Sequence, residues 1–577
     1  MEQIKRLPLG VSNFRYLRED NRYFVDNTQY IERLEKLSNF LFLVRPRRFG
    51  KSLFLSMLES YYDIDQKDDF DKLFGGLWIH EHPTDNRGKY LVMRYDFSQV
   101  RGNLEELPRA FNDYCEKVIG DFVSNYAHYF SDGFIDELKE EKDAFGKLGL
   151  VLFKCKRLCL PLYLIVDEYD NFTNVVLNSR GLADYEAITH GEGFFRDYFK
   201  LFKPNFERIL MLGVSPVTMD DLTSGYNIAT NITQDSTFNA IMGFSEPQVR
   251  EMVEYYRRAG LVNMETEEIV ADMKPWYDNY CFSKDSLDDA RVFNSDMVLY
   301  YLSNVIEKGT APESYLDENA RMDYGKIRKL ISYDKLDMRR KGLLLQIAKD
   351  GYINGRLVRQ FPAHEVIDES NFVSLLYYYG MLTIGGTRGA MLKLTIPNNN
   401  ARELYYEYIL REYNKEGVVD MFRLDELAYQ MAYAGDWRPM FEFIAGRYSE
   451  DSSVRSGIEG ERNYQGYMAA YMGQLSYYLV CPEMELNHGY ADFFLMPDKI
   501  RYKDVSHSYI VELKYLSKAD YKNGETAKKQ WDEAVGQIRE YAKAKRVGVM
   551  KQGTELHCIV IQMSGDEIGR MEEIDVQ

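Results

Sequence analysis

The chain has 577 residues, and its 72 Lys and Arg against 90 Asp and Glu give a formal net charge of −18. This balance excludes a protein covered in positive charge, and the length excludes a single small module. At about 150 residues per domain, the length predicts three to four domains. Hydrophobic residues at 45% and charged residues at 28% are typical of soluble globular proteins and argue against long disordered tracts.

The sequence contains no apolar run near the roughly 20 residues that cross a bilayer, and residues 1–6 lead into no secretory apolar segment. We therefore expect a cytoplasmic protein with no membrane partner. The six cysteines are scattered and lack zinc-site spacing, which predicts reduced, mostly buried thiols.

A strand, a loop and a helix are predicted around residue 50. Residues 41–44 are a short apolar run, residues 45–52 read Arg-Pro-Arg-Arg-Phe-Gly-Lys-Ser, and apolar positions from 53 to 58 recur with helical spacing. Further buried strands are predicted at 90–95, 162–166 and 208–214. Short apolar strands separated by helices indicate a parallel sheet that is covered on both faces.

The sequence Gly50-Lys51-Ser52 is typical of the end of a P-loop. Gly50 allows close approach to phosphate oxygens, Lys51 neutralises the β and γ phosphates of ATP, and Ser52 holds Mg²⁺ at a helix N-terminus. The generic pattern has a further Gly at position 45, where this chain has Arg45. The predicted nucleotide-binding residues are Arg45, Arg47, Arg48, Phe49, Gly50, Lys51, Ser52, Asp167 and Ser215.

The strand at residues 162–166 is followed by the two acids that a nucleoside triphosphatase needs. Asp167 is expected to orient the Mg²⁺ shell, and Glu168 to polarise the attacking water. The strand at 208–214 ends at Ser215, which either senses the γ-phosphate or only caps the chain before Pro216. Both interpretations of Ser215 stay open.

Several motifs in residues 5–310 resemble the AAA-ATPase-like family of bacterial proteins. The resemblance implies an ASCE-type ATPase with a helical lid, and in that family Arg-Pro-Arg-Arg-Phe is a usual form of the P-loop. Asn27 departs from the family, which usually has Lys there. The motifs are Gly10-Val-Ser-Asn-Phe, Tyr23-Phe-Val-Asp-Asn-Thr28, Arg45 to Ser52, Val166-Asp-Glu-Tyr-Asp170, Gly213-Val-Ser-Pro216 and Trp276-Tyr-Asp-Asn-Tyr280.

The middle of the chain is predicted to be mainly helical. A helix at 372–379 followed by a Gly-turned hairpin at 381–396 is typical of a winged-helix end or of a small α+β packing unit without a DNA contact. The polar stretch 450–457 reads as a linker. We therefore divide the chain into four parts: an ATPase core (1–240), a helical lid (241–310), a connector (311–450) and a C-terminal domain (451–577).

A second cluster of charged residues is predicted near the C-terminus, after a helix at about 461–478. Strands are expected at 491–496 and 508–514, and residues two apart on a strand share a face, so Glu512 and Lys514 point together. A neighbouring strand can bring Asp492 beside them. The two carboxylates and the Leu513 carbonyl offer oxygen ligands for Mg²⁺, and Lys514 can hold or deprotonate the attacking water.

Residues 455–565 resemble the PD-(D/E)xK nuclease superfamily, although the Pro before the Asp is absent. A helix at 530–543 and a strand at 556–563 complete the predicted restriction-endonuclease-like α/β domain. By this resemblance Glu461 is the helix-one acid and Gln537 the supporting helix residue. The predicted catalytic residues of the whole chain are Glu168, Glu461, Asp492, Glu512, Lys514 and Gln537, and the predicted metal ligands are Ser52, Asp167, Asp492, Glu512 and Leu513.

The two clusters predict an α/β multidomain protein in which ATP binding or hydrolysis regulates an Mg²⁺-dependent nuclease acting on DNA or RNA. Residues 501–550 carry 11 basic and 7 acidic side chains, a local charge of +4 that suits phosphate, although a solvated helix end explains it equally well. The alternatives are a signalling or scaffold ATPase whose C-terminal domain binds a partner without cleavage, and an active nuclease whose ATPase only binds nucleotide. A homo-oligomer is possible in each case.

Overall fold

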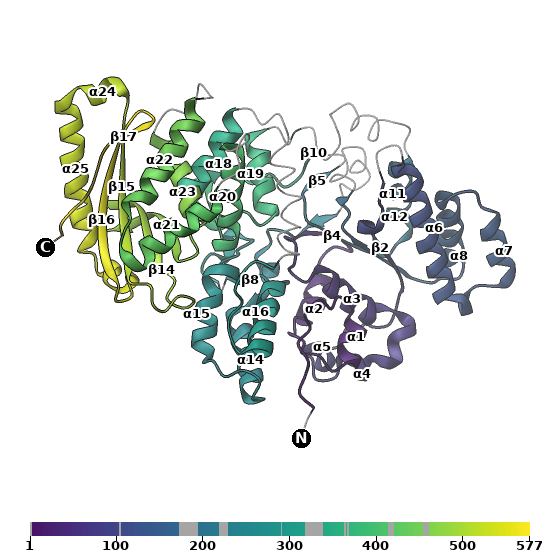
Figure 1. The fold of residues 1–577 in the computed structure, drawn as a ribbon. Coiled ribbons are helices and arrows are strands. Elements are labelled where there is room, and N and C mark those ends of the chain that lie inside the picture. The colour runs from purple at the N-terminus through teal and green to yellow at the C-terminus, as the bar shows by residue number, and fades with distance from the viewer. Residues whose placement is uncertain are drawn as a thin grey trace. The chain divides into compact units, whose positions relative to one another are not determined.

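The computed structural model describes residues 3–102, 106–171, 194–218, 229–289, 291–317, 338–362, 365, 368–413, 420–453, 461–487 and 489–576, without some side chains at element ends. The chain divides into two compact units, and Figure 1 shows their helices and strands. Unit 1 contains residues 1–331 and 354–397, and unit 2 contains residues 332–353 and 398–577. Among the described residues, no helix is long and apolar enough to span a membrane.

Unit 1 is built on a five-stranded sheet whose strand order is β2-β3-β4-β1-β6 and whose strand pairs are all parallel. The strands are β1 (Phe40–Val44), β2 (Leu91–Asp96), β3 (Leu162–Asp167), β4 (Arg208–Gly213) and β6 (Thr230–Asn231). Strand β4 lies between β1 and β3. The ends of β1, β3 and β4, which precede the predicted phosphate and metal ligands, therefore meet at one edge of the sheet.

Helices accompany this sheet, and the central one is α3 (Lys51–Tyr62), which follows β1 after a six-residue loop. Gly50 at the start of α3 has a φ of +83°, a backbone conformation that a residue with a Cβ adopts only with strain. The other helices of this part are α1 (Phe14–Glu19), α2 (Gln29–Glu35), η1 (Ile64–Asp69), α4 (Phe70–Phe74), α5 (Trp78–Glu81), η2 (Phe97–Gln99), α6 (Leu107–Asn125), η3 (Ala127–Tyr129), α7 (Asp132–Glu140), α8 (Ala144–Arg157), α11 (Phe194–Lys200), α12 (Phe202–Asn205) and η4 (Ser236–Phe238).

The predicted lid is helical, and its helices begin at clear caps. Ser245 and Gln248 form a capping box at α14, and the Asn294 side chain accepts the Met297 N–H at α16. These contacts satisfy backbone N–H groups that the first helical turn leaves without partners. The elements are β7 (Phe244–Ser245), α14 (Glu246–Arg258), α15 (Thr266–Tyr277), η5 (Lys284–Ser286), β8 (Val292–Phe293) and α16 (Ser295–Lys308).

The remaining part of unit 1 contains the predicted helix and hairpin. Helix α19 (Glu369–Tyr378) is followed by the antiparallel strands β11 (Thr383–Arg388) and β12 (Met391–Thr395), as both the winged-helix interpretation and the small α+β packing unit require. The register shifts between Ile384 and Gly386, which marks a bulge in the hairpin. Two short strands, β5 (Val217–Thr218) and β10 (Phe361–Pro362), pair in parallel.

Unit 2 contains a mixed sheet with the order β13-β14-β15-β16-β17, in which only β15 and β16 are parallel. Helix α25 (Gly524–Ala542) packs on one face, and α21 (Met421–Ala434), α22 (Arg438–Ser453) and α23 (Glu461–Met472) pack on the other (Figure 1). The strands are β13 (Tyr478–Leu486), β14 (Gly489–Pro497), β15 (His507–Leu516), β16 (Glu555–Ser564) and β17 (Glu567–Glu573).

Side chains from α25 and from alternate strand positions form a hydrophobic core on one face of this sheet. Trp531 and Ile538 of α25 pack in one cluster with Ile510 of β15 and with Cys558 and Val560 of β16. Since side chains alternate along a strand, the even-numbered residues of β15 face α25 and the odd-numbered ones face α21 to α23. The other elements are α18 (Met338–Asp350), β9 (Tyr352–Gly355), α20 (Asn399–Tyr413), α24 (Lys518–Lys522) and α26 (Lys545–Met550).

The structure corrects two local predictions. The helix predicted to reach residue 478 ends at Met472, and residues 478–486 form strand β13, because this segment pairs with β14 from Tyr478 opposite Pro497 to Leu486 opposite Gly489. Pro482 is compatible with this assignment, since β13 is an edge strand. Residues 450–453 of the predicted linker belong to α22, and residues 454–457 lie outside the described part.

Residues 398–450, which we assigned to the connector, group with the C-terminal sheet in unit 2. Residues 354–397, also assigned to the connector, group with the ATPase core. The four-part division of function stays a prediction, but the compact units of the chain are two. The chain passes between them three times, after residues 331, 353 and 397.

Candidate functional site: a phosphate loop and a carboxylate cluster

A cavity of about 830 Å³ lies at the predicted P-loop in unit 1. Its volume falls within the range of roughly 300–1,000 Å³ that is usual for small-molecule sites. Of the predicted nucleotide-binding residues, six line it: Arg47, Arg48, Phe49, Gly50, Lys51 and Ser52. The predicted catalytic base Glu168 lines it as well, as do Gly10 and Ser12 of the N-terminal motif.

Lys51 and Ser52 are oriented by short contacts within the loop and to β3. The Lys51 ammonium donates to the Pro46 carbonyl at 2.8 Å and to the Arg45 carbonyl at 3.1 Å, and burial lowers the pKa of this group. The Ser52 hydroxyl donates to Asp167 Oδ2 at 2.8 Å. The residues that should hold Mg²⁺ therefore already meet, as predicted from the paired motifs.

Asp167 at the end of β3 is buried and Glu168 is partly buried, and desolvation raises the pKa of both. Glu168 has a φ of +49°, which places this non-glycine residue in the left-handed region. Backbone strain of this kind is common at functional sites, where a side chain must be held in one direction. Glu168 lines the cavity. The arrangement puts a carboxylate with a raised proton affinity at the edge of the candidate phosphate site.

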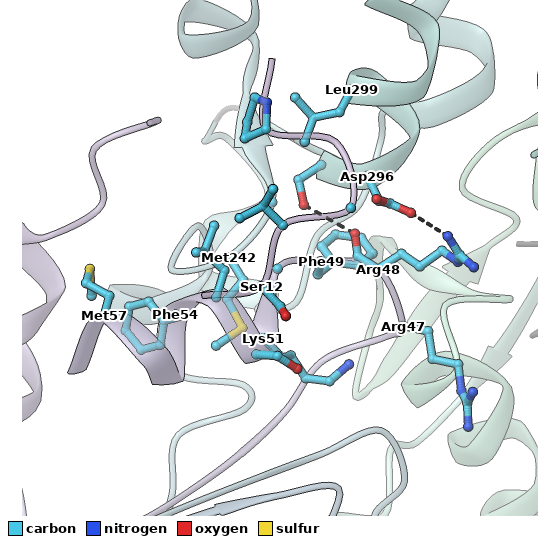
Figure 2. Close-up of a pocket in the computed structure, with 18 of the residues that line it drawn as sticks. Ser12, Arg47, Arg48, Phe49, Lys51, Phe54, Met57, Met242, Asp296 and Leu299 are labelled. Carbon is cyan, nitrogen blue, oxygen red and sulfur yellow. Dashed lines mark hydrogen bonds and ion pairs between the residues drawn. The ribbon is translucent and has the colours of Figure 1, made fainter. Parts of the chain in front are cut away.

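Helix α16 holds the other side of the loop. The Arg48 guanidinium contacts Asp296 Oδ2 at 2.5 Å, and Arg48 has a φ of +68°. The Arg48 carbonyl accepts the Ser295 hydroxyl and the Asp296 N–H, each at 3.2 Å. Figure 2 shows Arg48 turned toward Asp296, while Arg47 extends in a different direction. The N-terminus of α16 therefore contacts the P-loop through both side-chain and main-chain groups.

Arg45 does not join the cavity. Its guanidinium is fully buried, donates to the carbonyls of Val44, Thr233 and Phe238, and lies over the Phe282 ring at 4.3 Å. Burial lowers its pKa to about 10. The Arg45 side chain thus lies in the interior, where it donates to buried carbonyls. Contrary to the prediction, it does not line the cavity as a nucleotide-binding residue.

Ser215 is fully buried beyond the end of β4. Asp170 organises this turn, because its carboxylate accepts the N–H groups of Val214 and Ser215, the latter at 2.8 Å. The Tyr169 hydroxyl donates to the Ser215 carbonyl. Ser215 follows β4, the strand between β1 and β3. Its role, as a γ-phosphate sensor or only as a cap before Pro216, stays a prediction.

Two residues of this site were missed by the sequence reasoning. Arg94 on β2 forms an ion pair with Glu59 at 3.0 Å and lies 3.9 Å from Asp167 Oδ2. The sequence analysis named Asp170 only as the last residue of the motif Val166-Asp-Glu-Tyr-Asp170. The sequence contained a signal for each residue. Arg94 is a charged residue within an apolar strand, and Asp170 is a third acid shortly after Asp167 and Glu168.

The carboxylate cluster in unit 2 joins β14, β15 and α23. The Lys514 ammonium contacts Glu512 Oε1 at 2.8 Å, so the two side chains share a face as predicted. Asp492 Oδ2 accepts the Leu513 N–H at 2.7 Å, which places this carboxylate beside the Glu-x-Lys segment. Glu512 is only 2% exposed, so the cluster lies in a partly desolvated environment.

Gln465 and Tyr541 belong to this cluster although the sequence analysis did not select them. Gln465 Nε2 donates to the other Asp492 oxygen at 2.7 Å, and the residue is 2% exposed. Tyr541 on α25 interacts electrostatically with Glu512, Lys514 and Asp492, and burial raises its pKa to about 12. Tyr541 falls four residues after Gln537, a helical spacing that could have indicated it.

One predicted residue is not brought into the cluster, and the side chain of a second is not described. Gln537 is exposed on α25, and within the described part of the chain no hydrogen bond joins it to Asp492, Glu512 or Lys514. The helical period turns its neighbour Ile538 to the sheet instead. Glu461 begins α23, but its side chain lies outside the described residues. The catalytic roles of both stay predictions.

Comparison with known proteins finds one family match over each of the two sites. Residues 8–223 match the family described as predicted AAA-ATPase, and residues 459–573 match the PD-(D/E)XK nuclease superfamily. The chain therefore carries an AAA-ATPase-like domain followed by a PD-(D/E)XK nuclease superfamily domain. The first match contains the P-loop and the acids after β3, and the second contains Asp492, Glu512 and Lys514.

One curated relative is an uncharacterized protein in the vnfD 5' region of Azotobacter chroococcum mcd 1, which is 27% identical over 288 residues. The match covers 48% of each chain, so this chain spans about half the length of that relative. Two solved structures are similar with a TM-score of 0.25: Cdc6p of Pyrobaculum aerophilum at 11% identity, and the Orc1 protein of Aeropyrum pernix, in complex with DNA, at 10%. The matches cover 67% and 68% of this chain, and 94% and 95% of those chains. At this level they add no argument to the fold, which rests on the strand order.

Proposed function

We propose that this protein binds and hydrolyses ATP in unit 1 and that nucleotide turnover regulates a metal-dependent phosphodiesterase in unit 2 that cleaves nucleic acid. The observation that supports the proposal is that each of the two units brings several of the predicted site residues into contact. In unit 1, Ser52, which follows Lys51, donates to Asp167. In unit 2, Asp492 accepts the Leu513 N–H, and Glu512 pairs with Lys514.

The residues of unit 1 fit ATP and Mg²⁺. The positive φ of Gly50 leaves the loop open to a phosphate at the N-terminus of α3, where backbone N–H groups favour anions. Lys51 is held on the loop carbonyls and would bind the β and γ phosphates. Ser52 and Asp167 would hold the metal ion, which neutralises phosphate charge when bound. Glu168 would accept a proton from the attacking water.

The residues of unit 2 fit a hard divalent cation, since two carboxylates and the Leu513 backbone converge there. Asp492 and Glu512 would bind the metal ion, with the Leu513 carbonyl as a further ligand. The Lys514 ammonium would hold the attacking water or the phosphate. Regulation by ATP is proposed because both units belong to one chain, which passes between them after residues 331, 353 and 397. These features suit either DNA or RNA as the substrate, and they suit a homo-oligomer. A cytoplasmic location is part of the proposal and comes from the sequence.

The test measures ATP hydrolysis and nucleic-acid cleavage of the full chain, each with and without ATP and Mg²⁺. We expect Lys51→Ala to abolish ATP turnover and the ATP dependence of cleavage. We expect Lys514→Ala to abolish cleavage and to keep ATP turnover. Lys72→Ala and Lys543→Ala are matched controls, because both lysines are exposed and pair with a nearby glutamate, Glu19 or Glu540.

Two results would overturn the nuclease half of the proposal. One is the absence of Mg²⁺-dependent cleavage of DNA and RNA by the wild-type protein in either nucleotide state. The other is equal cleavage by wild type and Lys514→Ala. In either case, an ATP-dependent change of oligomer size that Lys51→Ala removes would favour the alternative of an ATPase scaffold that binds a partner without cutting.

A further inference from the structure

A cluster of histidines and carboxylates in unit 2 takes no part in the functions proposed above. His507 begins β15, Glu555 begins the neighbouring parallel strand β16, and His557 lies two residues further along β16. The register places His507 opposite Glu555 and Tyr509 opposite His557. Parallel pairing therefore brings three metal-binding side chains together at the N-terminal ends of two strands, although His507 and His557 are 50 residues apart.

The ligand atoms converge. His507 Nδ1 lies 2.9 Å from His557 Nε2 and 3.7 Å from Glu555 Oε2, and one such atom from each of the three residues lies within 4.8 Å of the others. In a tetrahedral zinc site with bonds of about 2.05 Å, ligand atoms are separated by about 3.3 Å. The observed separations lie on either side of that value. Small side-chain adjustments would therefore bring all three atoms to one ion.

The outer nitrogens of the histidines have partners of the kind that surround bound metals. His557 Nδ1 lies 2.7 Å from Glu573 Oε1, and the Trp437 indole N–H donates to Glu573 Oε2 at 3.0 Å. The backbone of Tyr433 also interacts electrostatically with the His507 ring. When His557 is neutral and donates through Nδ1, its Nε2 presents a lone pair toward the centre of the cluster. The cluster thus has outer contacts that orient its ligands.

The rings are also fixed by packing. The His557 ring stacks on Tyr509, with centroids 4.9 Å apart and planes at 19°, and the Tyr509 hydroxyl donates to the Met431 carbonyl of α21. Gly435 follows α21 with a φ of +71°, and a Cβ at this position would lie 3.0 Å from the His507 ring. His557 is 7% exposed, whereas the Glu555 side chain is 70% exposed. One side of the cluster is therefore rigid and buried, and the other is open to water.

We propose that His507, His557 and Glu555 bind one divalent transition-metal ion of the zinc type, with water in the open fourth position. Imidazole nitrogens together with a carboxylate favour Zn²⁺ and its neighbours over Mg²⁺. The two carboxylates, Glu555 and Glu573, carry two negative charges, which a dication balances. The ion would join the start of β15 to the start of β16 and so stabilise the central strand pair of unit 2.

This site is separate from the carboxylate cluster. His507 precedes Glu512 by five residues, or about 16 Å along a strand. The two residues also face opposite sides of the sheet, since odd-numbered positions of β15 face α21 and even-numbered ones face α25. The proposal consequently does not depend on whether Asp492 and Glu512 support cleavage.

The test titrates the full-length chain, without an affinity tag and after removal of metals by a chelator, with Co²⁺ alone, followed by Zn²⁺. We expect one equivalent of Co²⁺ to produce the visible absorption of a four- or five-coordinate ion, and Zn²⁺ to displace it. Zn²⁺ at about 100 times its Kd should raise Tm by about 5 to 10 °C. Metal analysis of the Zn²⁺-loaded protein gives the stoichiometry independently.

Substitutions of the proposed ligands test which residues bind the metal ion. His507→Asn and Glu555→Gln should remove the absorption or weaken Co²⁺ binding at least about 100-fold, and Glu573→Gln should weaken it about 10- to 100-fold. Glu555→Gln changes an exposed side chain, so it reports on binding even where a buried variant fails to fold. His128→Gln is the matched control, since His128 is an exposed histidine 3.2 Å from Asp65. The proposal is wrong if wild type gives no such absorption, or if His507→Asn and Glu555→Gln bind Co²⁺ as wild type does.

Discussion

The phosphate loop of unit 1 and the carboxylate cluster of unit 2 orient their charged groups by different means. In the loop, Lys51 is held by main-chain carbonyls, and Arg48 is held by the N-terminus of α16. In the cluster, strand register places Glu512, Leu513 and Lys514 beside Asp492, and one side chain, Gln465, adds a second contact. A loop site thus depends on distant elements that fix its backbone, whereas a sheet site derives its geometry from strand pairing.

This difference predicts that the two sites respond differently to substitution. Variants that change the backbone contacts of the P-loop should affect nucleotide affinity through the conformation of the loop. Variants on β14 and β15 should leave the fold of unit 2 intact and change only the chemistry, because the main-chain pairing of the strands remains.

The largest effect is expected for Glu168→Gln. Without the base, the rate of ATP hydrolysis should fall about 1,000-fold while ATP binding persists. Burial raises the pKa of Glu168, and the base acts only when ionised. The rate in the wild-type protein should therefore fall as the pH drops through a pKa above the ordinary value of 4.5. Measurement of kcat against pH tests this decrease on the acid side of the profile.

Glu141→Gln, at an exposed position, serves as the control for Glu168→Gln and should hydrolyse ATP as wild type does. An acid limb at or below 4.5, or unchanged hydrolysis in Glu168→Gln, would show that Glu168 is not the base.

A comparison of Asp492→Asn with Gln465→Ala measures how far the carboxylate cluster depends on a supporting contact. Asp492→Asn removes a proposed metal ligand and should lower the cleavage rate about 100-fold. Gln465→Ala removes only the hydrogen bond to Asp492 and should lower the rate about tenfold. Cleavage rates at saturating Mg²⁺, together with Tm values, separate chemistry from folding. A larger loss in Gln465→Ala than in Asp492→Asn would contradict strand register as the main source of this geometry.

The smallest effect is expected for Asp296→Asn, which removes the closer ion pair of Arg48 and leaves the one with Asp317 at 3.7 Å. Both side chains are about three-quarters buried, so the free energy of unfolding should fall by about 1 kcal/mol. The KM for ATP should rise about threefold, because the loop loses one of its restraints. Chemical denaturation and steady-state kinetics measure the two effects.

Asp197→Asn removes the exposed ion pair with Lys200 and should change the unfolding free energy by less than about 0.5 kcal/mol. Equal KM values for Asp296→Asn and wild type would mean that α16 does not control the loop.

Local patterns in the sequence predicted much of the fold and of both sites. The strands β1, β2, β3 and β4 follow from short apolar runs, and the strand, loop and helix around Gly50 follow from a change of hydrophobic period. The pair Glu512 and Lys514 follows from the two-residue repeat of a strand. These predictions succeeded because they depend on neighbours within about ten residues.

Other features were decided only by contacts between distant parts of the chain. Arg45 reads as a phosphate ligand in sequence, but the carbonyls of Thr233 and Phe238, almost 200 residues away, bind its guanidinium in the interior. The edge strand β13 was not predicted, and its pairing with β14 defines it. Gln465 reaches Asp492 only through the packing of α23 on the sheet.

The sequence by itself determined which chemical groups this protein carries and which local elements hold them, because motif spacing and hydrophobic period act over short distances. The tertiary structure decided which groups meet. The pairing of β15 with β16 joins His507 to His557, and the packing of α16 joins Asp296 to Arg48. Strand register and burial are set by the total packing of each unit, which no short segment of the sequence contains.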